Sequence, residues 1–163
     1  MNTAPARPQP ELLATLFRPF LKVEAAAWWL GASYDHTVRM IEERQIIGYN
    51  IAPRERDPAA EMDARENKRL LRILRPSVER LTDARLAHLS LDELRLEDAV
   101  GYPARPHLLL REVAQILDCH ANTVRRLRTE GLLRGPVLTL HGSGRLEHYD
   151  RAGFLGFLES RRI

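Results

Sequence analysis

The first quarter of the chain alternates short apolar runs with turn residues, a pattern that predicts short helices. Residues 23–30 (VEAAAWWL) place apolar side chains along one side of a helix, and Gly31 follows where a helix ends in the left-handed conformation. Asp35 is placed to cap a second helix that continues to about Arg44. Two short helices joined by a tight turn are therefore expected here.

A hairpin and a further helix are predicted next. Residues 48–52 (GYNIA) have the composition of a short strand, and residues 68–74 (KRLLRIL) can return as its partner. The stretch between these strands is polar and charged and contains two prolines, which predicts a long loop. Residues 77–89 then fit a helix that follows the hairpin.

Residues 90–106 have the character of a connection. The sequence SLDE at 90–93 has capping-box form and is expected to open a helix that reaches about Val100. GYPARP at 101–106 is the clearest linker signal in the chain. The charge also changes sign here: residues 82–106 contain three arginines and five acidic residues, whereas residues 107–163 contain nine arginines and six acidic residues. A domain boundary is expected near 101–106.

The second half of the chain repeats the plan of the first. LLLREVAQIL predicts a helix, DCH a turn, and ANTVRRLRTE a second helix that Gly131 ends. PVLTL and RLEHY predict two strands around the turn HGSG, and a final helix begins at Asp150. Each half therefore reads helix, turn, helix, hairpin, helix.

An alignment of the two halves supports an internal repeat. Matching Thr37 and Val38 with Thr123 and Val124 gives an offset of 86 residues, whereas the preceding helices match at 87. This difference predicts one extra residue in the first turn. The repeat indicates a tandem pair of modules.

The order of these elements and several short motifs resemble the excisionase/MerR-type winged helix-turn-helix group of DNA-binding proteins. The second half carries the likeness in LLLREVAQILDCHANTVRRLRTEGLL and RLEHYDRAGFLGFLE, and the first half carries a looser copy in LKVEAAAWWLGASYDHTVRMIEERQII and LLRILRPSVERL. The resemblance covers residues 21–81 and 107–161. It implies a mainly α fold with small β-hairpin wings and two tandem winged helix-turn-helix domains.

Four segments follow from this interpretation. Residues 1–20 form an N-terminal tail with a short helix, 21–89 the first domain, 90–106 a connecting helix and linker, and 107–163 the second domain. In such domains the second helix enters the major groove of DNA and the hairpin contacts the backbone nearby.

A helical wheel compares the second helices of the two halves. Val124 and Leu127 define a buried side, opposite which lie side chains rich in hydrogen-bond donors: Asn122, Arg125, Arg126 and Thr129. The same wheel around Val38 and Ile41 predicts a mixed exposed face made of His36, Arg39, Met40 and Glu43. The second copy is therefore the better candidate for reading a DNA sequence.

The residues expected to contact DNA come from both halves. The second helix of the second domain offers Asn122, Thr123, Arg125, Arg126, Arg128 and Thr129, and its hairpin offers His141, Ser143 and Arg145. The first domain offers His36, Thr37, Arg39, Lys68 and Arg69. A simpler alternative stays open, because arginines also occupy the solvated face of ordinary amphipathic helices, and Glu130 is placed to pair with Arg126.

Composition narrows the classes of function. Lys22 and Lys68 are the only lysines among 25 basic residues, a bias that fits bidentate recognition of phosphate or guanine and equally fits a GC-rich genome. The net charge of +3 and the pI near 9.4 are compatible with a nucleic-acid partner. Cys119 is the single cysteine, which excludes an intramolecular disulfide, and the six histidines show no metal-ligand spacing.

No catalytic residues, cofactor or membrane segment are predicted. A nucleophile with an arranged base is not visible, so we expect a protein that is not an enzyme, with no metal and no cofactor. The longest apolar run, AAAWWL, is too short to span a bilayer, and the first residues lack the apolar core of a signal peptide. A cytoplasmic, nucleoid-associated location is expected.

The expected function is sequence-specific binding of double-stranded DNA, as a transcriptional regulator, specifically a repressor, without a ligand-sensing domain. Double-stranded DNA is the expected partner, a homodimer or a protein partner is left open, and no small-molecule effector is expected. An excisionase-like or phage-packaging architectural factor is the alternative within the same class. A protein–protein interaction module on a winged-helix scaffold is the alternative from another class.

Overall fold

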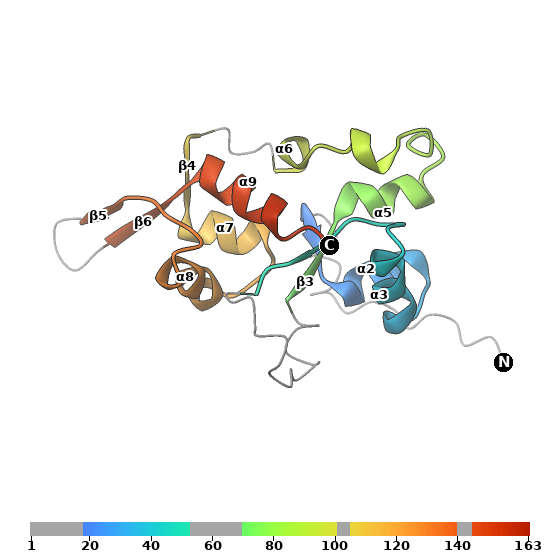
Figure 1. Cartoon of the computed structure of the whole chain (residues 1–163), viewed down its shortest axis with the longest axis horizontal. Helices are drawn as coiled ribbons and strands as arrows, with labels where there is room; N and C mark the ends of the chain where they lie inside the picture. Colours follow the sequence, from blue (N-terminus) through green and yellow to red (C-terminus); the bar gives the residue numbers. More distant parts are fainter. Residues whose placement is uncertain (1–17, 53–69, 101–104, 140–144) are drawn as a thin grey trace.

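The computed structural model describes residues 18–52, 70–100, 105–139 and 145–163. Within these residues the chain is a mixed α/β structure of short helices around two three-stranded antiparallel sheets. Figure 1 shows the two sheets and their helices as two units side by side, with the segment that carries α6 (Leu96–Ala99) running along one side from one unit to the other. The predicted combination of short helices with small hairpins is confirmed at this level.

The first unit builds its sheet from a short strand before the helices and a hairpin after them. Its strands follow the order β1-β3-β2, so the strand after the hairpin loop lies in the centre. The elements are β1 (Phe20–Leu21), α2 (Val23–Leu30), α3 (Tyr34–Glu42), β2 (Gly48–Asn50), β3 (Leu71–Leu74) and α5 (Arg75–Thr82).

The second unit has the same sequence of elements and the same strand arrangement, β4-β6-β5. Its elements are β4 (His107–Leu109), α7 (Leu110–Ile116), α8 (Ala121–Thr129), β5 (Val137–Thr139), β6 (Arg145–Asp150) and α9 (Arg151–Ser160). Leu108 and Leu109, which the sequence assigned to the first helix of this half, belong to the strand β4 instead. In both units this added strand pairs with the strand that follows the hairpin loop.

The helix–turn–helix segments of the two units align without an insertion. Gly31 and Asp118 both have positive φ, 65° and 47°, and so do Arg44 and Gly131, at 57° and 76°. Both pairs are 87 residues apart, so the predicted extra residue in the first turn is wrong. After the hairpin loop the separation falls to 76, as between Ile73 and Tyr149, which makes the first loop 11 residues longer.

This register changes which side of α3 faces the core. Thr37 aligns with Val124, and both side chains are fully buried. The Thr37 hydroxyl donates to the main-chain oxygen of Ser33 at 2.9 Å, which satisfies the buried oxygen. Met40 is buried as well, at 8% exposed, so the prediction that it lies on the solvent face is wrong.

Local capping also differs from expectation at two places. Ser33 caps α3, since its hydroxyl accepts from the His36 amide at 3.2 Å, and Asp35 lies inside the helix. The capping box at Ser90 and Glu93 is present, but it opens only a 3-10 turn, Leu91–Glu93, before α6 begins.

The break between these two pieces follows from where their apolar residues must point. In one continuous helix Leu91 and Val100 would face opposite directions, because they are nine residues apart. The extended backbone at Leu94 and Arg95 allows both ends of the segment to reach the core. The predicted helix over 77–89 is likewise shorter, and α5 ends at Thr82.

The two units share one hydrophobic core. Phe20, Tyr49 and Leu74 of the first sheet belong to the same buried cluster as Leu108 and Tyr149 of the second. Leu96 and Val100, from the predicted connecting segment, are buried in this cluster too. A smaller cluster packs α2 against α3 in the first unit alone. The repeated units are therefore held together by apolar packing over the described residues.

Main-chain pairing also links the units. Residues 161–163 follow α9 and run antiparallel to β2, the edge strand of the first sheet. The Asn50 amide donates to the Arg161 carbonyl, and the Ile163 amide donates to the Gly48 carbonyl, both at 3.0 Å. The C-terminal residues of the second unit thus cover an edge of the first sheet, and Figure 1 places this end of the trace between the units.

Candidate nucleic-acid interface

Helix α8 is set on the second unit by a tight turn and well-defined ends. His120 is its N-cap, and the Nδ1 atom accepts from the Asn122 amide at 3.1 Å. At the other end Gly131 adopts a left-handed φ, and the Leu132 amide donates to the Leu127 carbonyl at 2.9 Å. The predicted turn, helix and glycine stop are confirmed.

One side of α8 is buried and the opposite side is exposed. Val124 and Leu127 are both fully buried, in the core shared by the two units. The "exposed face of α8" consists of side chains that lie opposite them and are open to solvent: Asn122, Arg125, Arg126 and Thr129. Thr123 is half-buried at its edge. The helical wheel predicted this division correctly.

The two arginines of this face differ in their surroundings. Arg125 Nε lies 3.1 Å from Glu147 Oε2 on β6, and its Nη1 lies 3.4 Å from Asn122 Oδ1. The Arg126 side chain has no hydrogen-bond or ion-pair partner among the described residues. An exposed ion pair of the Arg125–Glu147 kind contributes only ~0–1 kcal/mol, so an incoming phosphate or base can replace the carboxylate at little cost.

Glu147 is a residue of this surface that the sequence did not identify. It lies 22 positions from Arg125, and the contact depends on how β6 packs beside α8. A search confined to α8 for acids one turn away cannot find it. The pair partly neutralises the face and also fixes the direction of the Arg125 side chain.

Arg128 is directed into the protein rather than toward the exposed face. Its guanidinium donates to the main-chain oxygen of His148 and lies 4.3 Å from the centre of the Tyr149 ring. The side chain is half-buried and holds α8 against β6. The expectation that Arg128 contacts DNA is therefore replaced by a structural role.

The hairpin of the second unit offers one described basic residue. Arg145 is exposed at the start of β6, whereas His141 and Ser143 lie outside the described residues. The strands themselves expose Val137, Leu138 and Leu146. Leu138 and Leu146 lie opposite each other in the strand register, so this part of the hairpin is more apolar than a surface that contacts phosphates.

The corresponding surface of the first unit is acidic. His36 and Arg39 are exposed on α3, as predicted, but they lie among Asp35, Glu42 and Glu43, which are exposed too. Thr37 is fully buried, so the prediction of a DNA contact there is wrong. Lys68 and Arg69 fall outside the described residues. Of the two second helices, α8 has the more favourable surface for an anion.

Other classes of site receive no support from the described residues. No group of three or more His, Cys, Asp or Glu side chains within them is arranged to hold a metal ion. No helix within the described ranges is both long enough and apolar enough to cross a membrane. Burial raises the pKa of the Cys119 thiol to about 11, with a smaller opposing effect from Arg72, which makes it a poor nucleophile near neutral pH.

Comparison of the chain with protein-family models, with curated proteins and with solved structures found no match.

Proposed function

We propose that this chain consists of two tandem winged helix-turn-helix domains and binds double-stranded DNA in a sequence-specific manner. The observation that carries the proposal is the exposed face of α8. This helix follows a short turn, packs Val124 and Leu127 into the core, and presents Asn122, Arg125 and Arg126 to solvent. A second helix with a donor-rich outer face is the element that helix-turn-helix proteins insert into the major groove.

The chemistry of the exposed face suits base edges and phosphates. A guanidinium forms two parallel hydrogen bonds with guanine O6 and N7, and an asparagine amide does the same with adenine N6 and N7. Arg126 has no described partner to release, and Arg125 exchanges its exposed contact with Glu147. Arg145 is exposed at the beginning of β6 and would contact the DNA backbone beside the helix.

The shared core makes the two units a rigid pair in this proposal. Two binding modules in one chain raise affinity because the second binding event is intramolecular. Here the apolar packing between Tyr49 and the second unit also restricts the spacing of any two DNA subsites. Asp35, Glu42 and Glu43 are exposed on or next to α3 and would repel phosphates. The first unit would therefore contact DNA through His36 and Arg39 only in an orientation that keeps these acids away from the backbone.

The biological role within this class follows from the sites bound. We propose a cytoplasmic, nucleoid-associated transcriptional regulator, and specifically a repressor that covers a promoter. An excisionase-like or phage-packaging factor uses the same α8 surface but binds attachment or packaging sites. Genomic occupancy, measured by chromatin immunoprecipitation with sequencing, separates these roles.

The proposal is tested on the full-length chain with a selected DNA duplex. Duplexes bound by the wild type are first selected from a random library, and affinity for the best sequence is then measured by fluorescence anisotropy at physiological salt. Arg125→Ala and Arg126→Ala should each weaken binding by ~1–3 kcal/mol, without lowering the melting temperature by more than a degree or two.

A matched control removes the same charge elsewhere. Arg85 and Arg95 are exposed in the segment between α5 and α6, away from α8 in the sequence. The double variant Arg85→Ala/Arg95→Ala should therefore leave duplex affinity nearly unchanged. If both double variants lost the same amount of duplex affinity, the binding would be explained by nonspecific electrostatic attraction. A folded Arg125→Ala/Arg126→Ala variant that binds as tightly as the wild type would refute the assignment of α8.

A protein-interaction module is the second candidate, favoured by the apolar hairpin surface of Val137, Leu138 and Leu146. Under this alternative, no duplex is enriched from the random library. A defined protein partner is instead lost from pull-downs when Leu138→Ser and Leu146→Ser are introduced. Retention of that partner by the variant would count against the hairpin as its binding surface.

A further inference from the structure

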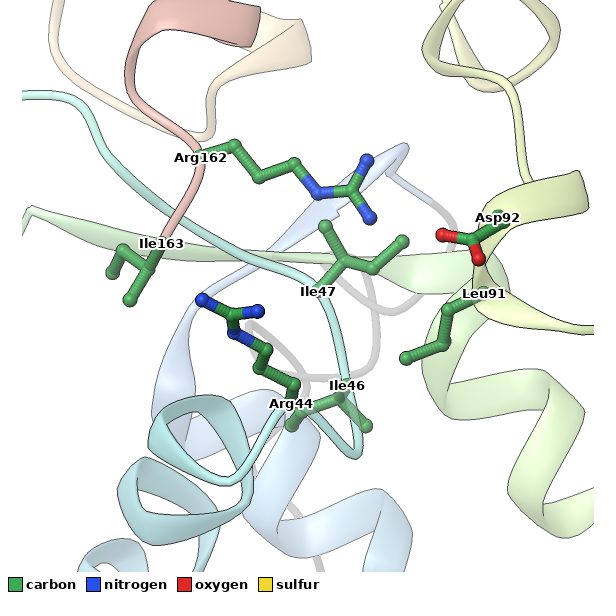
Figure 2. Close-up of a pocket in the computed structure, with 7 residues that line it drawn as sticks. All are labelled: Arg44, Ile46, Ile47, Leu91, Asp92, Arg162 and Ile163. Carbon is green, nitrogen blue, oxygen red and sulfur yellow. The ribbon is translucent and has the colours of Figure 1, made fainter.

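A cavity of about 570 Å³ lies where three segments distant in the sequence meet. The turn after α3 supplies Arg44, Ile46 and Ile47, the 3-10 turn supplies Leu91 and Asp92, and the residues after α9 supply Arg162 and Ile163. Figure 2 shows these side chains around a common space, with the Arg162 guanidinium directed toward Asp92 and the Arg44 guanidinium lying between Ile163 and Ile47. The volume is typical of sites for small molecules, which span ~300–1,000 Å³.

The lining combines two cations with apolar walls. Leu91 is half-buried against the shared core and forms the part of the aliphatic wall that a ligand can reach, whereas Ile46 and Ile47 are almost completely buried behind it. Neither Arg44 nor Arg162 forms an ion pair with an acidic residue of the described chain. Asp92 faces Arg162 from the opposite wall of the pocket in Figure 2.

The backbone at Arg44 gives an independent reason to assign its side chain a role. Its φ of 57° lies in the left-handed region, which favours glycine, and the equivalent residue of the second unit is Gly131. The other described non-glycine residue with positive φ is Asp118, which occupies the position equivalent to Gly31 in the second unit. The Asp118 side chain is used within the protein, because its carboxylate pairs with Arg18 and lies 3.9 Å from Lys22.

Arg44 has no such use among the described residues. Glycine or asparagine at this position would form the same turn with less strain. The exposed side chains of Arg44 and Arg162 line the same pocket without an acidic partner among the described residues, and a ligand that both cations bind would give the arginine at this position a role.

We propose that this cavity binds a small monocarboxylic acid with a branched aliphatic body. Its carboxylate would receive hydrogen bonds from Arg44 and Arg162, and its hydrocarbon part would lie on Leu91. Two guanidiniums bind a carboxylate more strongly than a neutral acceptor because the hydrogen bonds are charge-assisted. Asp92 repels a second negative charge at the far end of the ligand, which selects a monoanion over a dicarboxylate.

This site differs from the proposed DNA interface in location and chemistry. It involves neither α8 nor the second hairpin, so it stands or falls independently of DNA binding. No small-molecule effector was expected from the sequence, in which no local motif brings these residues together. Residues 44–47, 91–92 and 162–163 become neighbours only in the folded chain.

The test uses the isotopically labelled full-length chain and 4-methylpentanoate as the probe, followed by nuclear magnetic resonance titration. Saturable shifts are expected at the Nε–H groups of Arg44 and Arg162 and at the amides of residues 46–47 and 163. The same carbon skeleton without a charge, 4-methylpentan-1-ol, should give much weaker shifts, and so should the dianion glutarate. Acetate provides a carboxylate without the aliphatic body and should bind at least about tenfold more weakly.

Two variants separate a binding role from a structural one. Arg44→Gly relieves the left-handed strain, so its melting temperature should equal or exceed that of the wild type while its affinity for 4-methylpentanoate falls about tenfold or more. Arg162→Gln should weaken binding similarly, and Arg39→Gln, on the exposed side of α3, should not. The proposal is overturned if both cavity variants bind like the wild type, or if acetate or the alcohol binds as tightly as 4-methylpentanoate.

Discussion

The guanidinium of Arg72, on the central strand of the first sheet, donates to the main-chain carbonyl of Asp118, in the turn before α8, at 2.9 Å. The same side chain donates to the Leu117 carbonyl at 2.5 Å, and Arg72 is only 2% exposed. Burial lowers the pKa of Arg72, while the nearby Cys119 and Asp118 act in the opposite direction. A buried cation of the first unit therefore fixes the turn that positions the candidate DNA-reading helix of the second.

Replacing this cation should destabilise the whole chain. Arg72→Leu leaves the Leu117 and Asp118 carbonyls without their donor in the contact between the units, and we expect a loss of about 2–4 kcal/mol in the free energy of unfolding. Urea denaturation followed by circular dichroism measures it. Arg111→Leu, at an exposed position of α7, is the control and should change stability by less than about 0.5 kcal/mol. A small loss in Arg72→Leu would mean that apolar packing alone holds the units together.

Neighbouring arginines of α8 should separate stability from binding. Arg128→Ala removes the contact with the Tyr149 ring and the hydrogen bond to His148, so it should lower the free energy of unfolding by about 1–3 kcal/mol. Arg126→Ala should leave thermal unfolding unchanged and reduce duplex affinity. The reverse pattern in paired melting and anisotropy measurements would show that Arg126 is structural and Arg128 is the one that reaches DNA.

Gly135 allows a close approach between the segment before β5 and β6. A Cβ atom at this position would lie 2.2 Å from the main-chain oxygen of His148, and backbone cannot move away cheaply. Gly135→Ala is therefore expected to cost more than about 2 kcal/mol of stability. Gly156→Ala is the matched control, because its Cβ meets no atom within 4 Å in α9 and alanine favours helix by ~0.5–1 kcal/mol. Differential scanning calorimetry should show a lower melting temperature for Gly135→Ala and a higher one for Gly156→Ala than for the wild type.

Alkaline pH should weaken the folded state through two buried acids. Burial is the main cause that raises the pKa of Cys119 from 9.0 to about 11 and that of Tyr49 from 10.0 to about 12. Between these values the unfolded chain has lost protons that the folded chain retains, so the free energy of unfolding falls as pH rises. Below pH 9 these groups are protonated in both states, and their stabilising contribution is fully present.

Thermal melts between pH 8 and pH 11 measure this effect. We expect Cys119→Ala to flatten the decline that begins near pH 9, since it removes the group with the lower ordinary pKa. A wild-type melting temperature that stays constant to pH 11 would contradict the predicted burial of both groups.

Much of the secondary structure followed from local pattern. The helix of residues 23–30, its glycine stop, the strands on either side of HGSG and the buried side of α8 are all signals carried by nearby residues. The short strands β1 and β4 were missed because two or three residues form a strand only when a partner such as β3 or β6 lies beside them. The error at Thr37 arose because matching TV with TV outweighed the turn geometry that relates Gly31 to Asp118.

The candidate sites were predictable to a different extent. Periodicity located the exposed arginines of α8, because a helix fixes which residues share a face. It could not show that Arg128 turns onto Tyr149 or that Arg125 meets Glu147, since those partners come from β6. The Arg44–Arg162 cavity had no local signal, because its walls come from segments that only the folded chain brings together.

The pairing of residues 161–163 with β2 affects how the chain folds as it is synthesised. Gly48 and Ile163, whose main chains are hydrogen-bonded, are separated by 115 positions. A ribosome therefore completes the second unit before the edge strand of the first sheet meets its last partner. Contacts between such distant residues slow folding, because a long loop must close first. The first unit should remain incompletely protected from proteases on nascent chains that stop before residue 161.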